Sequence, residues 1–327
     1  MKKVRVGIVG CGGIANAHVN GYAANSDVEL VAFFDTAPAN AEKFMQKFGG
    51  KVYDSLDNMY SSDTLDAISV CTPPVAHKDT VIAALDKGIN VLCEKPLAIS
   101  VDDSKEMVEK ANKTGKFLMT AFAWRFHKEI QRTKQLISEG KIGKVVMVRN
   151  SFAGYADMSQ KWFSKKEISG GGCFIDAGIH SIDIYRYIFG DIKNVWAKMR
   201  TVASSLQVED IARVMVETPE GIVGSIDISW STGIGPGVCL EVYGTEGTIE
   251  VMWSSMRYRT RTEKEWTVEE TKTPEDNPFR LETKHFVDVI LGKTQPIVNG
   301  IDGMKAMEVT EAVYQSAKTN IWQPVKG

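Results

Sequence analysis

The sequence predicts an α/β protein in which an N-terminal doubly wound parallel sheet precedes an α/β domain with a large, mostly antiparallel open sheet. Short apolar runs alternate with helix-like segments as far as about Ala123, which is typical of parallel strands joined by right-handed crossovers. Later segments alternate apolar and polar residues, as antiparallel strands do. The chain has 327 residues, which is longer than a domain with a single hydrophobic core usually is. We therefore expect a first domain of residues 1–122 and a second of residues 123–327, whose last helix can pack back on the first domain.

Each element of the first domain has a local signal. Apolar runs of strand length fit strands that are buried on both faces. Pro38 suits the first turn of a helix, Lys87-Gly88 suits a helix end, and Ser100 suits an N-cap that acidic residues follow. The expected strands are Val4–Val9, Val28–Phe34, Leu65–Cys71, Ile89–Cys93 and Phe117–Phe122, and the expected helices are Ile14–Ala24, Pro38–Phe48, Val75–Asp86 and Ser100–Lys113.

The second domain combines a few helices with β-rich segments. Turn sequences such as Thr218-Pro219-Glu220-Gly221 separate segments in which apolar and polar residues alternate. This pattern predicts a sheet with one face covered and one face open. The expected strands are Lys144–Phe152, Val195–Thr201, Ala212–Glu217, Val223–Trp230 and Leu240–Tyr243, and the expected helices are Lys128–Ser138 and Asp302–Ala317.

Composition excludes several classes of function. The chain has 39 basic and 41 acidic residues, a formal net charge of −2, so we expect no nucleic-acid partner. No stretch can span a membrane, and the apolar N-terminal run, which Arg5 interrupts, is too short for a signal peptide. We expect a cytoplasmic protein with no membrane partner. The five cysteines are widely spaced and include no CxxC pair, so we expect reduced thiols rather than disulfides or a zinc ribbon. They are Cys11, Cys71, Cys93, Cys173 and Cys239.

A glycine-rich turn follows the first expected strand. Its sequence, Gly10-Cys11-Gly12-Gly13-Ile14-Ala15, has the form G-x-G-x-x-A. Gly10 permits the tight turn, Gly12 lets a pyrophosphate approach the backbone, and Ala15 lets the helix pack close to the strand. The N–H groups of the helix start, including those of Gly13 and Ile14, then face the phosphates. The alternative is a plain tight turn between a strand and a helix.

Asp35 follows the second expected strand, at about the distance where an acidic residue contacts the ribose of a dinucleotide. Its carboxylate can accept hydrogen bonds from the 2′-hydroxyl and repel a 2′-phosphate. The residues that follow, Thr36 to Asn40, include no lysine or arginine. The sequence therefore predicts NAD rather than NADP as the cofactor.

Glu94-Lys95-Pro96 ends the expected strand Ile89–Cys93. Ligands of doubly wound sheets bind beyond the carboxyl ends of the strands, so these charges stand where chemistry takes place. Lys95 can hydrogen-bond a reacting oxygen and stabilise a developing alkoxide, and Glu94 can anchor Lys95 or contact the nicotinamide ribose. The alternative is a pair of solvated charges at a strand end.

The stretch from Gly170 to His180 has three glycines followed by Asp176 and His180, four residues apart and so on one face of a helix. A histidine aligned with a carboxylate suits proton transfer near neutral pH, and the glycines suit a close approach of substrate. Two alternatives remain, a capped helix with a satisfied polar histidine and a metal site of Cys173, Asp176 and His180. The second lacks a further ligand cluster, so we expect no metal.

Together these motifs resemble the signature blocks of the glucose-fructose oxidoreductase / inositol dehydrogenase / rhizopine catabolism (Gfo/Idh/MocA) family, and they occur in its order. The resemblance implies a Rossmann domain, a second domain with an open sheet, and an NAD-dependent dehydrogenase acting on CH–OH groups. It also implies homodimers or homotetramers formed through the sheet's open face. The blocks that carry it span nearly the whole chain: Gly10–Ala15, Thr72–His77, Gly88–Pro96, Gly170–His180, Tyr243–Thr248 and Asp302–Ser316.

The resemblance also implies roles for particular residues. Lys95, Asp176 and His180 match the family's catalytic positions, with Lys95 polarising the oxygen and His180 exchanging the proton. Positions that match the lining of the cofactor cleft are Thr72, Pro73, His77 and Glu94. Many members have Trp-Arg before the glycines, where this chain has Trp162-Phe163, which makes Arg125 the expected cationic contact to the cofactor.

The expected substrate is a neutral sugar, inositol or related polyol. No arginine cluster suggests a phosphorylated or nucleotide-linked sugar. Trp124, Tyr155 and Trp162 are candidate substrate contacts because aromatic faces suit sugar rings, although aromatic residues also serve as core or oligomer contacts. Two other functions stay open at this point, an NAD-dependent glycosidase and a non-catalytic sugar or nucleotide sensor of the same fold.

Overall fold

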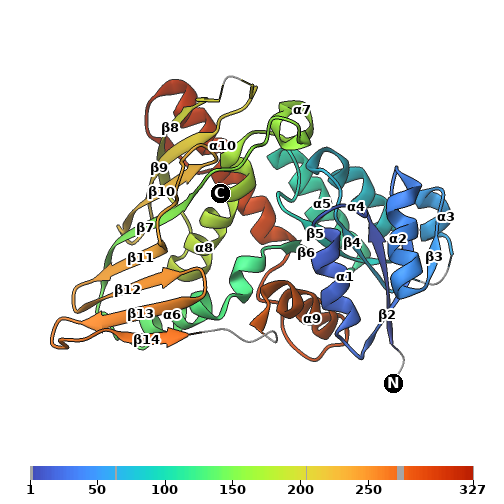
Figure 1. The fold of residues 1–327 in the computed structure, drawn as a ribbon, viewed down its shortest axis with the longest axis horizontal. Coiled ribbons are helices and arrows are strands. Elements are labelled where there is room, and N and C mark those ends of the chain that lie inside the picture. Colours follow the sequence, from blue (N-terminus) through green and yellow to red (C-terminus); the bar gives the residue numbers. More distant parts are fainter. Residues whose placement is uncertain (1–2, 63–64, 204, 271–275, 327) are drawn as a thin grey trace. The chain divides into compact units, whose positions relative to one another are not determined.

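The computed structural model describes residues 3–62, 65–203, 205–270 and 276–326, which form two compact units (Figure 1). The first unit contains residues 1–123 and 277–304, and the second contains residues 124–276 and 305–327. The segment 277–304 thus belongs with the first unit, whereas the sequence boundary assigned it to the second. Its helix packs on the first helix of the chain, where a Cβ on Gly21 would lie 2.3 Å from Oγ1 of Thr283.

The first unit is built on a six-stranded parallel sheet with the order β3-β2-β1-β4-β5-β6. β1 lies between β2 and β4, so the chain reverses its direction of winding there, as in a doubly wound fold. This confirms the predicted fold class. The strands are β1 (Val4–Val9), β2 (Val28–Phe34), β3 (Lys51–Val52), β4 (Ala67–Val70), β5 (Asn90–Glu94) and β6 (Leu118–Ala121).

Helices connect these strands, and their ends follow the sequence signals. The side chain of Ser100 accepts a hydrogen bond from the N–H of Asp103, and Gly115 ends the same helix in the left-handed conformation. The core contains Val81 and Leu85 of α4 with Met107 of α5. The helices of this unit are α1 (Ala15–Ala23), α2 (Pro38–Phe48), α3 (Leu56–Tyr60), the 3₁₀ turn η1 (Pro74–Ala76), α4 (His77–Asp86), α5 (Val101–Thr114) and α9 (Pro278–Ile290).

The second unit is built on a nine-stranded sheet with the order β14-β13-β12-β11-β7-β10-β9-β8-β15. All of its pairings are antiparallel except that of β7 with β10. This confirms the predicted mostly antiparallel sheet. The strands are β7 (Val145–Ala153), β8 (Asn194–Arg200), β9 (Ile211–Glu217), β10 (Val223–Ser229), β11 (Val238–Gly244), β12 (Gly247–Met252), β13 (Ser255–Thr260), β14 (Thr267–Glu270) and β15 (Gln323–Pro324).

Helices cover one face of this second sheet. The hydroxyl of Tyr185 in α8 donates to the carbonyls of Val148 in β7 and Ser225 in β10, so α8 lies directly on the strands. The helices and turns are η2 (Ala123–Phe126), α6 (Lys128–Ser138), η3 (Trp162–Ser164), α7 (Lys166–Ser169), the π turn η4 (Phe174–Gly178), α8 (Ile179–Phe189) and α10 (Gly300–Thr319), whose first residues belong to the other unit.

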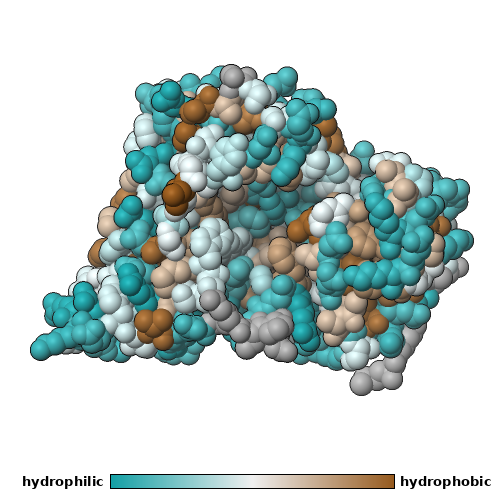
Figure 2. All heavy atoms as spheres, viewed as in Figure 1, coloured by the Kyte–Doolittle hydropathy of each residue, from teal (hydrophilic) through white to brown (hydrophobic). Residues whose placement is uncertain are grey.

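Polar and apolar residues are mixed on the face that Figure 2 shows. In the view of Figure 2, hydrophilic residues predominate over α2 and α3 of the first unit. Across the described ranges, none of the helices combines the length and the apolar character that crossing a bilayer requires. All five cysteines are free and buried.

Candidate functional site

The glycine-rich turn has the geometry of a phosphate-binding loop. Gly10 has a φ of +85°, and a Cβ on it would lie 2.8 Å from the backbone of Cys71. A Cβ on Gly12 or Gly13 would meet nothing within 4 Å, so open space lies beside the backbone there. The hydroxyl oxygen of Thr72 is buried and has no hydrogen-bond partner within the described part of the chain. An open cradle with an unused buried polar atom beside it fits a dinucleotide.

Asp35 is tied to this turn by its carboxylate. Its Oδ2 accepts a hydrogen bond of 2.7 Å from the N–H of Cys11, and its Oδ1 accepts one of 2.8 Å from the N–H of Ala37. The carboxylate is therefore fixed at the end of β2, next to the cradle. Carboxylate oxygens have further lone pairs, so this position allows Asp35 to bind a ribose hydroxyl as well.

His77 joins the two motifs that follow β4 and β5. Its Nδ1 lies 2.9 Å from the carbonyl oxygen of Pro96, and its Nε2 lies 2.8 Å from that of Thr72. The imidazole is fully buried, and this burial lowers its pKa. The structure thus brings together Thr72, His77 and the Glu94–Pro96 corner, with Lys95 half-buried at the end of β5 and a cis peptide bond after it.

Glu94 is held in place by residues that sequence reasoning did not single out. Its Oε1 lies 2.9 Å from Nε2 of His18, and its Oε2 accepts a hydrogen bond of 3.1 Å from the N–H of Lys95. Nδ1 of His18 lies 3.2 Å from Oγ of Ser69, which is in turn 2.8 Å from the hydroxyl of Tyr22. His18 lies eight residues beyond Gly10 on the first helix, and this place just after the motif was the only signal available.

The network around His18 is charged although it lies in the core. Burial opposes charge on the imidazole, but the Cys71 sulfur and the Glu94 carboxylate raise the pKa of His18 to about 10. Burial also disfavours charge on Glu94, yet His18 and Lys95 lower the pKa of this carboxyl below its usual value. The imidazolium and carboxylate form a buried ion pair, and the carboxylate fixes the backbone of Lys95.

The second unit contributes Asp176 and His180. Asp176 lies in the π turn η4, where the N–H of Ile179 reaches the carbonyl of Phe174 five residues earlier, and His180 lies in the first turn of α8. The predicted helix therefore begins with a wider turn, a feature that is frequent at functional sites. Both side chains are half-buried.

The glycines before Asp176 make room for protein atoms. A Cβ on Gly171 would lie 2.0 Å from the hydroxyl oxygen of Tyr314, and one on Gly172 would lie 2.0 Å from the carbonyl oxygen of Glu209. Sequence reasoning connected these glycines with a close approach of substrate, whereas the structure explains both by packing inside the second unit. Neither Glu209 nor Tyr314 carried a sequence signal that linked it to this segment.

Arg125 and Asp183 form a buried ion pair in the second unit. Nη2 of Arg125 lies 2.6 Å from Oδ1 of Asp183, and Nε donates to both carboxylate oxygens at 3.0 and 2.9 Å. The two side chains are 5% and 0% exposed. A protein carboxylate already neutralises this guanidinium, and a contact between Arg125 and the cofactor stays a prediction.

The three aromatic residues predicted to contact substrate have different surroundings. Trp124 stacks on His127, with ring centroids 4.3 Å apart, and also contacts Phe152 and Trp253. Trp162 stacks on Phe163 at 3.7 Å, whereas Tyr155 is 74% exposed. Within the described ranges, no group of three or more His, Cys, Asp and Glu side chains could hold a metal ion.

Comparison with known proteins identifies the class of protein that this fold and these motifs define. Residues 4–122 match the model of the oxidoreductase family with an NAD-binding Rossmann fold, GFO_IDH_MocA, and residues 130–250 match the model of the GFO/IDH/MocA C-terminal domain. The chain belongs to this family. Its N-terminal unit is an NAD-binding domain, and the protein is an NAD-dependent oxidoreductase.

Relatives align over nearly the full length of the chain. D-glucoside 3-dehydrogenase of Escherichia coli K12 is 28% identical over 97% of this chain and 96% of its own. Myo-inositol 2-dehydrogenase of Thermotoga maritima is 27% identical over 96% of each chain. Among solved structures, the aldose-aldose oxidoreductase of Caulobacter crescentus complexed with glycerol has a TM-score of 0.91 and 25% identity, and the match covers 99% of this chain and 100% of that one.

Proposed function

We propose that this protein oxidises, or in the reverse direction forms, a hydroxyl-bearing carbon of a neutral sugar, inositol or related polyol. The observation that carries the proposal is the place of Lys95. Lys95 directly follows β5, in the corner that His77 ties to Thr72, and the buried His18–Glu94 pair holds its backbone. The relatives named for activity on a glucoside and on inositol support the class of substrate.

Bound NAD⁺ supplies the acceptor for the hydride that leaves the hydroxyl carbon. We assign its contacts to the turn from Gly10 to Ala15, to Asp35, and to the cluster formed by Thr72, Pro73, His77 and Glu94. The N–H groups of the turn hold the pyrophosphate, Asp35 holds the adenosine ribose, and Thr72 offers its unused hydroxyl.

We assign the removal of the hydroxyl proton to three side chains. The ammonium group of Lys95 hydrogen-bonds the substrate oxygen and stabilises the negative charge that develops on it. His180 accepts the proton, because a neutral imidazole has a ring nitrogen that can take one. Asp176 orients His180 or binds a neighbouring hydroxyl. Trp124, Tyr155 and Trp162 remain candidates for contact with the sugar ring.

Replacing Lys95 tests this assignment. With a panel of sugars and inositols, we expect the wild-type protein to form NADH and Lys95→Ala to lose at least about 100-fold in kcat, while NADH binding measured by fluorescence changes little. A sensor would keep its ligand response in the variant, and a glycosidase would cleave a chromogenic glycoside without net NADH. Turnover confined to compounds that are not sugars or polyols would overturn the proposed substrate class.

Asp35 carries the proposed preference for NAD over NADP. Its fixed carboxylate repels a 2′-phosphate, so we expect kcat/KM to be higher with NAD. Asp35→Ser should lower the ratio of kcat/KM with NAD to kcat/KM with NADP by about 10-fold or more, because one like-charge contact is worth on the order of 1 kcal/mol or more. Asn40→Ala, which changes a neighbour of Asp35 at 3.4 Å without removing charge, is the control. A wild-type preference for NADP would contradict this assignment.

We also propose that the protein is a cytoplasmic homodimer or homotetramer. Buried free thiols suit a reducing compartment. On the uncovered face of the second sheet, Met147 pairs with Val223 and Tyr243 on the neighbouring strands, and Met147 and Val223 are 44% and 42% exposed. An exposed apolar row of this kind suits a second copy. Sedimentation equilibrium tests it, and a monomer at micromolar concentration would exclude it.

A further inference from the structure

We propose that Glu209 and Tyr314 are positioning residues that hold the segment bearing Asp176 and His180 in its reactive geometry. The inference rests on the proposed function, because it assumes that these two side chains act on the substrate. Glu209 precedes β9 and Tyr314 lies in α10, so both are distant in sequence from the segment that they contact.

Glu209 contacts every residue from Gly172 to Phe174. Its Oε1 accepts hydrogen bonds from the N–H of Gly172 at 3.0 Å and from the N–H of Phe174 at 3.1 Å. Its own carbonyl accepts one from the N–H of Cys173 at 2.8 Å. Three successive peptide N–H groups are thus bound by one residue, which fixes the backbone where it enters the π turn.

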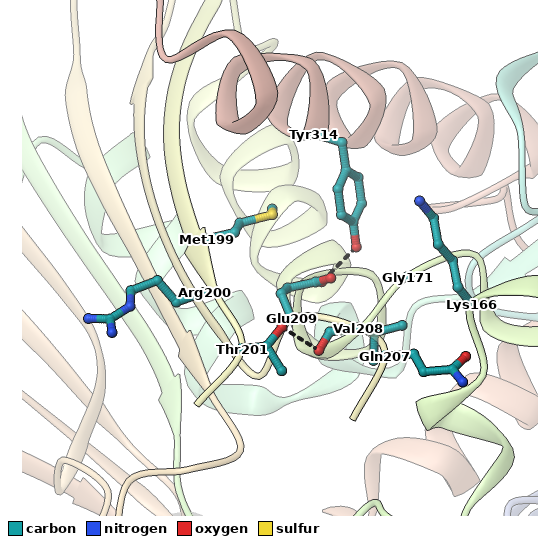
Figure 3. Close-up of a pocket in the computed structure, with 9 residues that line it drawn as sticks. All are labelled: Lys166, Gly171, Met199, Arg200, Thr201, Gln207, Val208, Glu209 and Tyr314. Carbon is teal, nitrogen blue, oxygen red and sulfur yellow. Dashed lines mark hydrogen bonds between the residues drawn. The ribbon is translucent and has the colours of Figure 1, made fainter. Parts of the chain in front are cut away.

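Tyr314 holds the carboxylate of Glu209 in place. Its hydroxyl donates to Oε1 of Glu209 at 2.7 Å, a bond that Figure 3 shows at the wall of a cavity of about 300 Å³. The same hydroxyl lies against Gly171, where a Cβ would approach it to 2.0 Å. The two glycines and the two larger residues therefore fit one another, since a side chain on either glycine would displace Tyr314 or Glu209.

Their influence reaches Asp176 through one further hydrogen bond. The N–H of Asp176 donates to the carbonyl of Gly172 at 3.1 Å. The N–H of the same Gly172 donates to the carboxylate of Glu209. His180 follows in the first turn of α8. A shift of Gly172 therefore moves Asp176 directly and changes where the helix that carries His180 begins.

The test compares Tyr314→Phe, Glu209→Ala and Glu209→Gln in the full-length protein. We expect Tyr314→Phe to lower kcat about 10-fold and Glu209→Ala about 100-fold, as for misplaced catalytic groups, with the KM for NAD within twofold of wild type. Glu209→Gln keeps an acceptor oxygen and should recover most of the loss. Gln207→Ala is the control, because Gln207 lines the same cavity and is exposed.

A second measurement does not depend on activity. The chain has five histidines, so the imidazole resonance of His180 can be assigned by its loss in His180→Asn. We expect Tyr314→Phe and Glu209→Ala to shift the NMR titration of His180 and to speed amide exchange at residues 172–176, and to leave His77 unchanged. If Glu209→Ala does not fold, Tyr314→Phe and Glu209→Gln carry the test.

The possible failures can be told apart. A wild-type protein that turns over no sugar or polyol would refute the proposed function, and the NMR measurement would still test whether Glu209 and Tyr314 fix the segment. If both Tyr314→Phe and Glu209→Ala fold and keep wild-type kcat and the wild-type titration of His180, the positioning role is wrong. An equal loss in Gln207→Ala would also overturn it.

Discussion

At the scale of single residues, the molecule places charge inside its first core in order to fix one backbone. His18 is fully buried, yet its imidazolium pairs with Glu94, whose other oxygen holds the N–H of Lys95. Removing one partner of a buried pair leaves the other charge uncompensated, which is costly. The pair therefore matters for stability, and it also holds the backbone of Lys95.

The buried pair predicts a dependence of stability on pH. Because the folded state raises the pKa of His18 from 6.5 to about 10, the stability that its charge contributes is complete below about pH 6.5 and is lost as the pH rises toward 10. In urea unfolding, the wild type should lose on the order of 3 kcal/mol more between pH 7 and pH 10 than His18→Gln does. Equal losses in the two proteins would contradict this account. Lysines and tyrosines that titrate in the same range are common to both proteins and cancel.

Sequence reasoning identified residues whose role depends on local geometry. Gly10 and Asp35 could be predicted because a positive φ and a carboxylate after β2 are set by their neighbours in sequence. Glu209 and Tyr314 could not, because their role depends on contacts with a segment 35 or more residues away, and no spacing rule links them. Arg125 differs from both, since its assignment to the cofactor stays a prediction, whereas its pairing with Asp183 was not predicted.

At the scale of elements, local signals fixed most helices and strands of the chain. α2 and α6 have the predicted bounds, because Pro38 and the period of the apolar residues define them. α9 was not predicted, although Asn277 caps it and Pro278 begins it. Strands β13 and β14 were not predicted either, because exposed charged residues such as Arg259 and Glu270 lie in them.

The cap of α5 allows a measurement at this scale. Ser100 accepts a hydrogen bond from the N–H of Asp103 at 3.1 Å. Ser100→Ala should lower the free energy of unfolding by about 1 kcal/mol, the usual cost of losing such a cap. Ser26→Ala, in an exposed turn, should change it by less than about 0.5 kcal/mol. Identical effects of the two substitutions in urea titrations would show that the cap contributes nothing.

At the scale of the whole molecule, the chain builds its first unit from two separate stretches. The sequence indicated two domains and their order, since both follow from length and from the change of pattern near residue 123. It did not indicate that residues 277–304 join the first unit, because that depends on the packing of α9 against α1.

This division predicts how the protein can be dissected. Residues 1–123 alone would expose the face of α1 on which Thr283 and α9 pack, so we expect this fragment to be aggregated or partly unfolded. Adding residues 277–304 through a flexible Gly–Ser linker should give a cooperative thermal transition and restore NADH binding. Circular dichroism and fluorescence titration measure both. A short fragment that unfolds as cooperatively as the extended one would argue against the division.

The concealment of every thiol in this chain has a practical consequence. Burial raises the pKa of the Cys11 and Cys239 thiols to about 12, and the other three cysteines are equally inaccessible. Maleimide dyes should therefore react with cysteines introduced on the surface and not with the natural ones, so the natural cysteines need not be replaced first. One dye in each unit would make the distance between the two units, and its response to added nucleotide, accessible to single-molecule energy transfer.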